Sequence, residues 1–221
     1  MTHNRDEKVA RPTAIPPQKY VVNKKNVYYP KDPQAGGTWY AVSESGVVVV
    51  LLNGAEEKHE PKSSYLRSRG LIVLDLISSN SSFEAWNSID LMGIEPFTIV
   101  LYQEQKLYQL RWDEVHKTTL QLDLNQSYIW SSTTLYSKEI REYRRSFFQE
   151  FLLSREITAD TILAFHKYTN SDDQENGLII NRNNEMRTLS ITQTVIQGNN
   201  VLLSYHDLQN QQNFINSITT Q

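Results

Sequence analysis

A short polar cluster near the amino end of the sequence is the first place where residue types and spacing could do chemistry. Asn4-Arg5-Asp6-Glu7 places a guanidinium between an amide and two carboxylates. An arginine can hold a carboxylate through two parallel hydrogen bonds, and an aspartate can accept hydrogen bonds from an ammonium group. The same residue types also suit a charged, exposed turn. The spacing therefore makes these residues candidates and leaves both interpretations open.

Two glycine-containing segments are the next candidates. Ala35-Gly36-Gly37-Thr38-Trp39 places flexible backbone just before a predicted strand, where a ligand could approach closely. Asn53-Gly54 follows a predicted buried strand, where an amide NH₂ or a glycine N–H could point at a developing oxyanion. Both segments are also typical of ordinary turns, so the structural interpretation stays open beside the functional one.

The composition excludes other kinds of chemistry. The 221 residues include no cysteine, which removes disulfides, zinc–thiolate sites and thiol nucleophiles from this chain. The five histidines are scattered and no glycine-rich phosphate loop is present, so we expect neither a metal nor a cofactor. With a net charge of −3, nucleic acid is not an expected partner. The basic residues Arg141, Arg144 and Arg145 predict a solvated helix face.

Hydrophobic periodicity predicts the elements that must position these candidates. The predicted strands are residues 19–22, 26–29, 38–43, 47–52, 97–102, 106–112, 118–122, 128–132, 177–180, 187–196 and 201–208. The predicted helices are residues 63–77, with Ser63-Ser64 as the N-cap, 83–89, 137–153 and 158–168. Hairpin links between the strands favour an α+β fold with mainly antiparallel sheets. Because residues 47–52 are apolar on both faces, we expect two sheets between helix layers.

The chain as a whole is typical of one globular domain over residues 1–221. Its longest apolar run, residues 47–52, is far shorter than the ~20 residues that span a bilayer. The opening residues contain no apolar signal-peptide core, so we expect a cytoplasmic protein. The Asn/Gln-rich tail, residues 209–221, is expected to fray.

Taken in order, these motifs resemble the NRDE family, which is named for the tetrapeptide of residues 4–7 and includes transport and Golgi organisation 2 proteins. The resemblance spans nearly the whole chain, and besides the segments above it rests on Arg11-Pro12, Ser68-Arg69-Gly70, Gly93-Ile94-Glu95-Pro96-Phe97, Tyr128-Ile129-Trp130-Ser131-Ser132 and Ser190-Ile191-Thr192. It implies the four-layer αββα sandwich of N-terminal nucleophile hydrolases, which agrees with the predicted element order.

The resemblance also implies roles for individual residues. Arg5 and Asp6 would lie beside a nucleophile and its free α-amine, and Asn53 would supply an oxyanion hole. Ser132 and Arg187 correspond loosely to a second catalytic amide and a late catalytic arginine. Ligand contacts are expected from Asn4, Gly36, Gly37, Trp39 and Gly54.

The sequence departs from the family pattern at its amino end. Family members begin Met-Cys and continue through a strand to the tetrapeptide, whereas this chain begins Met1-Thr2-His3. We therefore expect a domain without its first strand, inactive as the amide (C–N) hydrolase or acyltransferase that the complete form would be. Thr2 is the other conceivable nucleophile. The alternative function is a binding or trafficking module that holds a small amide, acyl or hydrophobic ligand without turnover.

Overall fold

Apolar strands from the first half of the chain form a seven-stranded antiparallel sheet. The computed structural model describes residues 1–220. The strands of this sheet lie side by side in sequence order: β2 (Ile15–Val22), β3 (Lys25–Lys31), β4 (Tyr40–Ser43), β5 (Val48–Asn53), β6 (Phe97–Gln103), β7 (Lys106–Trp112) and β8 (Lys117–Leu122). Most neighbours are joined by hairpins or loops, but α1 and α2 lie between β5 and β6, and the predicted meander of residues 97–122 is present as β6, β7 and β8.

The second, five-stranded sheet joins the two ends of the chain. Its path is β1 (Thr2–Lys8), β10 (Met186–Gln197), β11 (Asn200–Asp207) and β12 (Gln212–Thr219), and β9 (Asn181–Arg182) also pairs with β10. Strand β1 contains the tetrapeptide, and its pairing with β10 shifts register between Arg5 and Asp6. Among the described strands β1 pairs with β10 alone, so its other edge is open.

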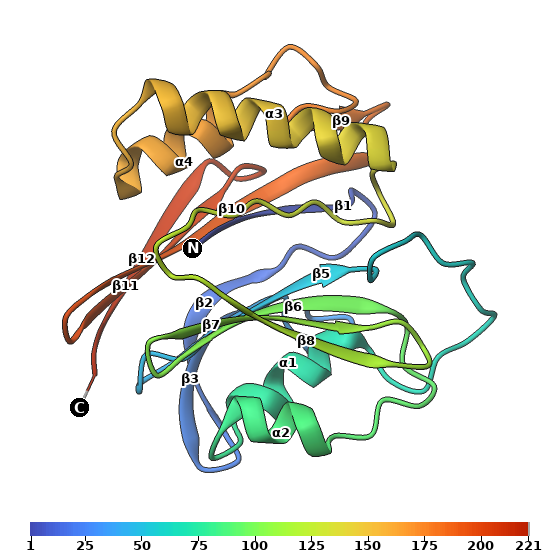
Figure 1. The fold of residues 1–221 in the computed structure, drawn as a ribbon, viewed down its shortest axis with the longest axis vertical. Helices are drawn as coiled ribbons and strands as arrows, with labels where there is room; N and C mark the ends of the chain where they lie inside the picture. The colour runs from blue at the N-terminus through green and yellow to red at the C-terminus, as the bar shows by residue number, and fades with distance from the viewer. Residues whose placement is uncertain (221) are drawn as a thin grey trace.

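Helices cover the outer faces of both sheets. The seven-stranded sheet is covered by α1 (Arg69–Ile77) and α2 (Ser82–Ser88), and the five-stranded sheet by α3 (Lys138–Ser154) and α4 (Ala159–Tyr168) (Figure 1). The result is the predicted four-layer αββα sandwich. A serine or threonine is the N-cap of each helix. At α4, Thr158 and Thr161 form a reciprocal capping box, which satisfies two backbone N–H groups at the start of the helix.

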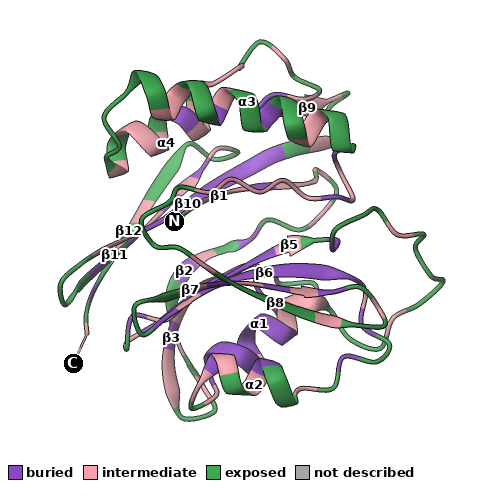
Figure 2. Cartoon of the chain, viewed as in Figure 1, coloured by how far each residue is buried: buried purple, intermediate pink, exposed green. Residues whose placement is uncertain are grey.

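The main hydrophobic core lies on both faces of the seven-stranded sheet. Residues 48–51 of β5 are all buried, so side chains on both faces of this strand lie in the core, which explains why residues 47–52 have no polar face. Figure 2 shows the same distribution, with buried central strands and exposed outer helix faces. A smaller hydrophobic cluster of Phe148, Phe165 and Leu178 packs α3 against α4.

Two predicted strands are wrong. Residues 128–132 are irregular: Trp130 Nε1 donates to Gln109 Oε1 at 2.8 Å, and the Ser132 hydroxyl donates to the Asn53 carbonyl at 2.8 Å. These side-chain hydrogen bonds replace a strand ladder. Residues 177–180 are irregular as well, because the Arg144 guanidinium takes the Gly177 carbonyl as its acceptor.

Two boundaries also differ from the predictions. Helix α1 begins at Arg69 and its N-cap is Ser68, whose hydroxyl accepts from the Gly70 N–H at 3.3 Å, so Ser63 and Ser64 precede the helix. The polar tail, expected to fray, forms β12 instead. It pairs with β11 from Gln212 to Thr219 and buries Ile218, and this long-range pairing outweighs its polar composition. Gln221 lies outside the described residues.

Candidate functional site

A cavity of about 660 Å³ lies along the open edge of β1, a size in the range that holds small organic ligands. Most of β1 lines it, together with parts of β5, α3 and α4. Another wall is the crossing segment, residues 123–137, which runs from β8 to α3 in front of both sheets (Figure 1). The tetrapeptide of residues 4–7 is therefore part of the cavity wall.

Arg5 points toward the seven-stranded sheet. Its guanidinium carbon lies 4.1 Å from the centre of the Trp39 ring, and its Nη2 lies 3.6 Å from Oε2 of Glu7. Burial lowers the pKa of Arg5, and the Glu7 carboxylate opposes that shift. The guanidinium nevertheless stays charged, because its ordinary pKa is far above neutrality. Arg5 is thus a buried cation with a loosely held partner, suited to binding a carbonyl or carboxylate oxygen.

Asp6 points the opposite way, toward α3. Its carboxylate accepts hydrogen bonds from the hydroxyls of Tyr136 and Thr188, each at 2.6 Å. Burial raises the pKa of Asp6, and these two hydrogen bonds oppose the shift. The guanidinium of Arg144 lies 3.5 Å from the centre of the Tyr136 ring. Asp6 therefore attaches β1 to the crossing segment, and its catalytic role stays a prediction.

Asn4 attaches β1 to α4 and to the loop before β9. Its side-chain amide donates to the Leu178 carbonyl at 2.7 Å, and its Oδ1 lies 2.9 Å from Nδ1 of His166. Arg5 and Asn4 thus face different neighbours although both line the cavity, because side chains alternate along a strand.

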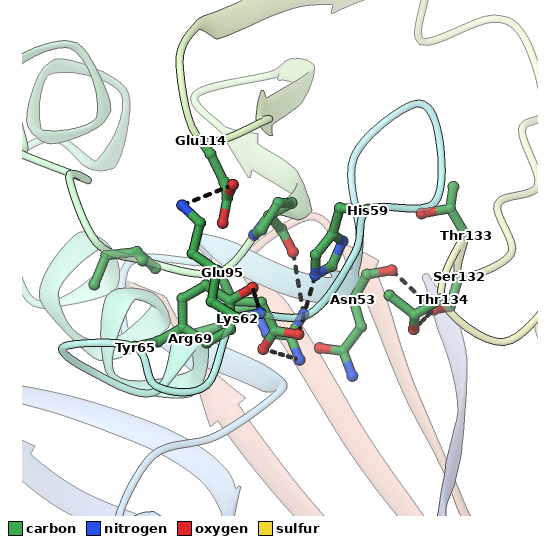
Figure 3. A network of polar contacts seen from close by, with 12 residues as sticks. Asn53, His59, Lys62, Tyr65, Arg69, Glu95, Glu114, Ser132, Thr133 and Thr134 are labelled. Carbon is green, nitrogen blue, oxygen red and sulfur yellow. Dashed lines mark hydrogen bonds and ion pairs between the residues drawn. The ribbon is translucent and has the colours of Figure 1, made fainter.

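The structure brings Asn53 and Ser132 together at the end of β5. The Ser132 hydroxyl bonds to the Asn53 carbonyl and lies 2.9 Å from the Thr134 hydroxyl. Figure 3 shows the Asn53 side chain extending away from both hydroxyls. Both predicted residues line the cavity, and the exposed Asn53 amide is available to a ligand there.

The two glycines before Trp39 do different things. Gly37 lines the cavity and packs directly against Gly70 at the start of α1. Gly36 has φ +73° in a turn, where its N–H donates to the Asp32 carbonyl at 2.8 Å. Gly36, Gly54 and Arg187 are not among the residues that line this cavity, and Arg187 is exposed on β10 opposite Glu7.

Sequence reasoning gave no site role to Arg144 or to Arg69 of the Ser68-Arg69-Gly70 motif, yet both line the cavity. Arg144 was expected on a solvated face but is only 5% exposed, and it lies one turn from both Ile140 and Phe148 on the apolar side of α3. That spacing was the available signal. Arg69 Nη2 lies 2.9 Å from Glu95 Oε2, and His59 Nε2 lies 3.2 Å from the other oxygen of Glu95 (Figure 3).

Two histidines beside the cavity predict a pH-dependent stability. Burial lowers the pKa of His3 to about 4 and that of His166 to about 3. The unfolded chain binds these protons near pH 6.5, so it takes up more protons than the folded chain below that pH. The free energy of unfolding should therefore fall on acidification, by about 2 kcal/mol per histidine between pH 7 and 5. Urea denaturation at pH 7 and pH 5 measures this loss of stability. An equal loss in the His3→Gln/His166→Gln variant would show that the two histidines do not cause it.

Within residues 1–220, no three or more His, Cys, Asp or Glu side chains group together in a way that could hold a metal ion. The groups at the cavity wall are instead guanidinium, amide and hydroxyl, which suit the oxygen atoms of an organic ligand. No helix in the same residues has the length and apolar character needed to cross a membrane.

Comparisons with known proteins agree with this architecture. No curated protein sequence matches the chain. Among solved structures, a cysteine-to-alanine mutant of conjugated bile acid hydrolase from Clostridium perfringens is similar, with a TM-score of 0.51 and 11% identity over 98% of this chain and 87% of that one. An arginine-to-leucine variant of that enzyme gives a TM-score of 0.45 at 11% identity, over 99% of this chain and 84% of that chain. The first likeness shows an N-terminal nucleophile hydrolase type of fold. The sequence model of the family Transport and Golgi organisation 2 matches residues 1–212, and the chain therefore belongs to that family.

Proposed function

We propose that the cavity binds a small amphiphilic molecule through an acyl or amide oxygen and holds it without cleaving it. The observation that carries the proposal is the uneven lining of the cavity. Arg5 and Arg69 both lie near Glu7, and Arg11 lies near Arg5, so these three arginines mark one end of the cavity. Since Thr2 pairs with Gln193, the other end lies beyond the start of β1, beside Val195 and Ile196.

Apolar side chains from five other parts of the chain, namely β6, β7, the crossing segment, α3 and α4, also line the cavity. They are Val100, Leu107, Ile129, Trp130, Phe148, Leu152 and Ile162. An aliphatic chain buried among them would gain roughly 0.8 kcal/mol per CH₂ group. A ligand with a polar head at Arg5 and an aliphatic tail along β1 fits this lining, and an N-acyl compound has both parts.

Binding without cleavage is proposed because of the groups that face the ligand. The 221 residues contain no thiol, and the Thr2 hydroxyl accepts a hydrogen bond from Gln193 Nε2 at 3.0 Å. The alternative is hydrolysis of the amide bond, the activity for which the bile acid hydrolase is named. It is favoured by one observation, namely that Arg5 and Asn53 line the same cavity.

Titration with N-dodecanoylglycine tests the proposal. The wild-type chain should bind this amide, and Arg5→Gln should weaken binding about tenfold or more, because hydrogen bonds to a charged group contribute ~1.5–3 kcal/mol. Calorimetry measures both affinities. Arg155→Gln, at the exposed end of α3, is the matched control and should bind like the wild type.

Two results would count against the proposal. If Arg5→Gln binds the probe with wild-type affinity, Arg5 does not contribute to ligand binding. Release of glycine from the probe would establish hydrolysis instead. If Arg5→Gln fails to fold, Leu107→Trp tests the apolar end of the cavity, where the added ring should obstruct the acyl chain.

A further inference from the structure

A second, smaller pocket lies beside the main cavity. Its volume is about 50 Å³, which suits one small ion and is far below the size of an organic ligand site. Five residues line both spaces and form the wall between them: Leu52, Asn53, Ile129, Trp130 and Ser131. The pocket is therefore next to the proposed ligand, and its remaining lining residues do not line the main cavity.

Three guanidinium groups converge on this pocket. Arg111 comes from β7, and Arg141 and Arg145 come from successive turns of α3. Within residues 1–220, the buried Nε atoms of Arg111 and Arg141 have no hydrogen-bond partner. A buried donor without an acceptor costs about 1–3 kcal/mol, so these two atoms favour an acceptor in the pocket.

The acidic groups nearby are too exposed to neutralise the arginines fully. Glu56 contacts Arg111, and Glu57 Oε2 lies 3.9 Å from Arg141 Nη2. The side chains of Glu56 and Glu57 are 68% and 75% exposed, and ion pairs of such groups are weak. Burial lowers the pKa of Arg111, and the charge of Arg141 lowers it further. An anion between the two guanidinium groups would oppose both effects on this pKa, because a negative charge stabilises the charged form of each arginine.

Hydrogen bonds hold the walls of the pocket in place. The Thr98 hydroxyl donates to the Gly54 carbonyl at 3.0 Å, and Arg141 Nη1 donates to the Glu56 carbonyl at 3.0 Å. Gly54 has φ +86°, and a Cβ at this position would clash with the Thr133 hydroxyl. The turn that follows β5 therefore has a specific shape that places the arginines around a common space.

We propose that this pocket binds a phosphate-like oxyanion between Arg111, Arg141 and Arg145. Guanidinium groups match the oxygens of phosphate through parallel hydrogen bonds. Glu56 then acts as an exposed internal competitor, because its carboxylate contacts Arg111. The anion is either free or the head group of an amphiphile, since the pocket and the main cavity share a wall.

Calorimetric titration with inorganic phosphate at constant ionic strength tests the site. We expect saturable binding by the wild type and a loss of about tenfold or more in Arg141→Gln/Arg145→Gln, consistent with charge-assisted hydrogen bonds. Glu56→Gln should bind phosphate more tightly, because the competing carboxylate is gone. Arg155→Gln is the control for a change of one surface charge. Absence of saturable binding, or unchanged affinity in the double variant, overturns the proposal.

Hexyl phosphate distinguishes the two sources of the anion. Tighter binding than inorganic phosphate, with the gain removed by Leu107→Trp, assigns the pocket to the head group of an amphiphile. Equal affinity for the two probes assigns it to a free anion. The phosphate titration does not involve the amide probe, so failure of the proposed function leaves this result unaffected.

Discussion

Gly37→Ala is expected to reduce the free energy of unfolding by roughly 3 kcal/mol or more, because it overpacks a backbone contact in the core. An added Cβ would clash with the carbonyl carbon of Gly70 and lie 2.7 Å from the nitrogen of Leu71. These are backbone atoms of α1, and the Thr38 N–H donates to the Gly70 carbonyl at 3.1 Å. The helix would have to move away from β4. Urea denaturation measures the loss.

Gly36→Ala is the matched control at the neighbouring position. Gly36 has φ +73°, and a Cβ there would meet no atom within 4 Å. Only the left-handed backbone conformation is penalised, at about 1–2 kcal/mol. Equal losses of stability for the two variants would show that the close contact between Gly37 and Gly70 does not cause the loss.

Asp6→Ala is expected to cost about 3 kcal/mol or more, the range for removing one partner of a buried charged network. The substitution leaves the hydroxyls of Tyr136 and Thr188 without their acceptor. It also removes the carboxylate next to Arg144 and Arg182, whose charges act on Asp6. The crossing segment would lose its attachment to β1. Chemical denaturation measures the stability, and titration with the amide probe measures the cavity.

Two companion variants separate a structural role of Asp6 from a role in ligand chemistry. Asp6→Asn keeps the shape and one acceptor, so it should recover part of the stability. Glu7→Ala removes the neighbouring carboxylate, which is half-buried and 3.6 Å from Arg5, and should cost about 1 kcal/mol or less. If Asp6→Ala is as stable as Glu7→Ala yet loses the ligand, Asp6 acts on the ligand and the attachment is secondary.

Local patterns predicted most of the fold. Short-range periodicity and turn residues predict the hairpin of β4 and β5, which turns at Gly46, and the meander of β6, β7 and β8. Both are present. The errors share a physical cause. Residues 128–132 are rich in strand-favouring side chains, yet their hydrogen bonds go to Gln109 and to the Asn53 carbonyl, which are distant in sequence. The polar tail, conversely, becomes β12 by pairing with β11.

The sequence by itself determined which residues are candidates, because Arg5, Asp6 and Asn53 are distinguished by type and spacing alone. Only the tertiary structure decided what each of them faces. Pairing of β1 with β10 joins the two ends of the chain, and strand alternation then directs Arg5 toward Trp39 and Asp6 toward Tyr136. The same long-range packing buries Arg144 and groups Arg111 with Arg141. Such contacts depend on side chains far apart in the sequence, and no local pattern records them.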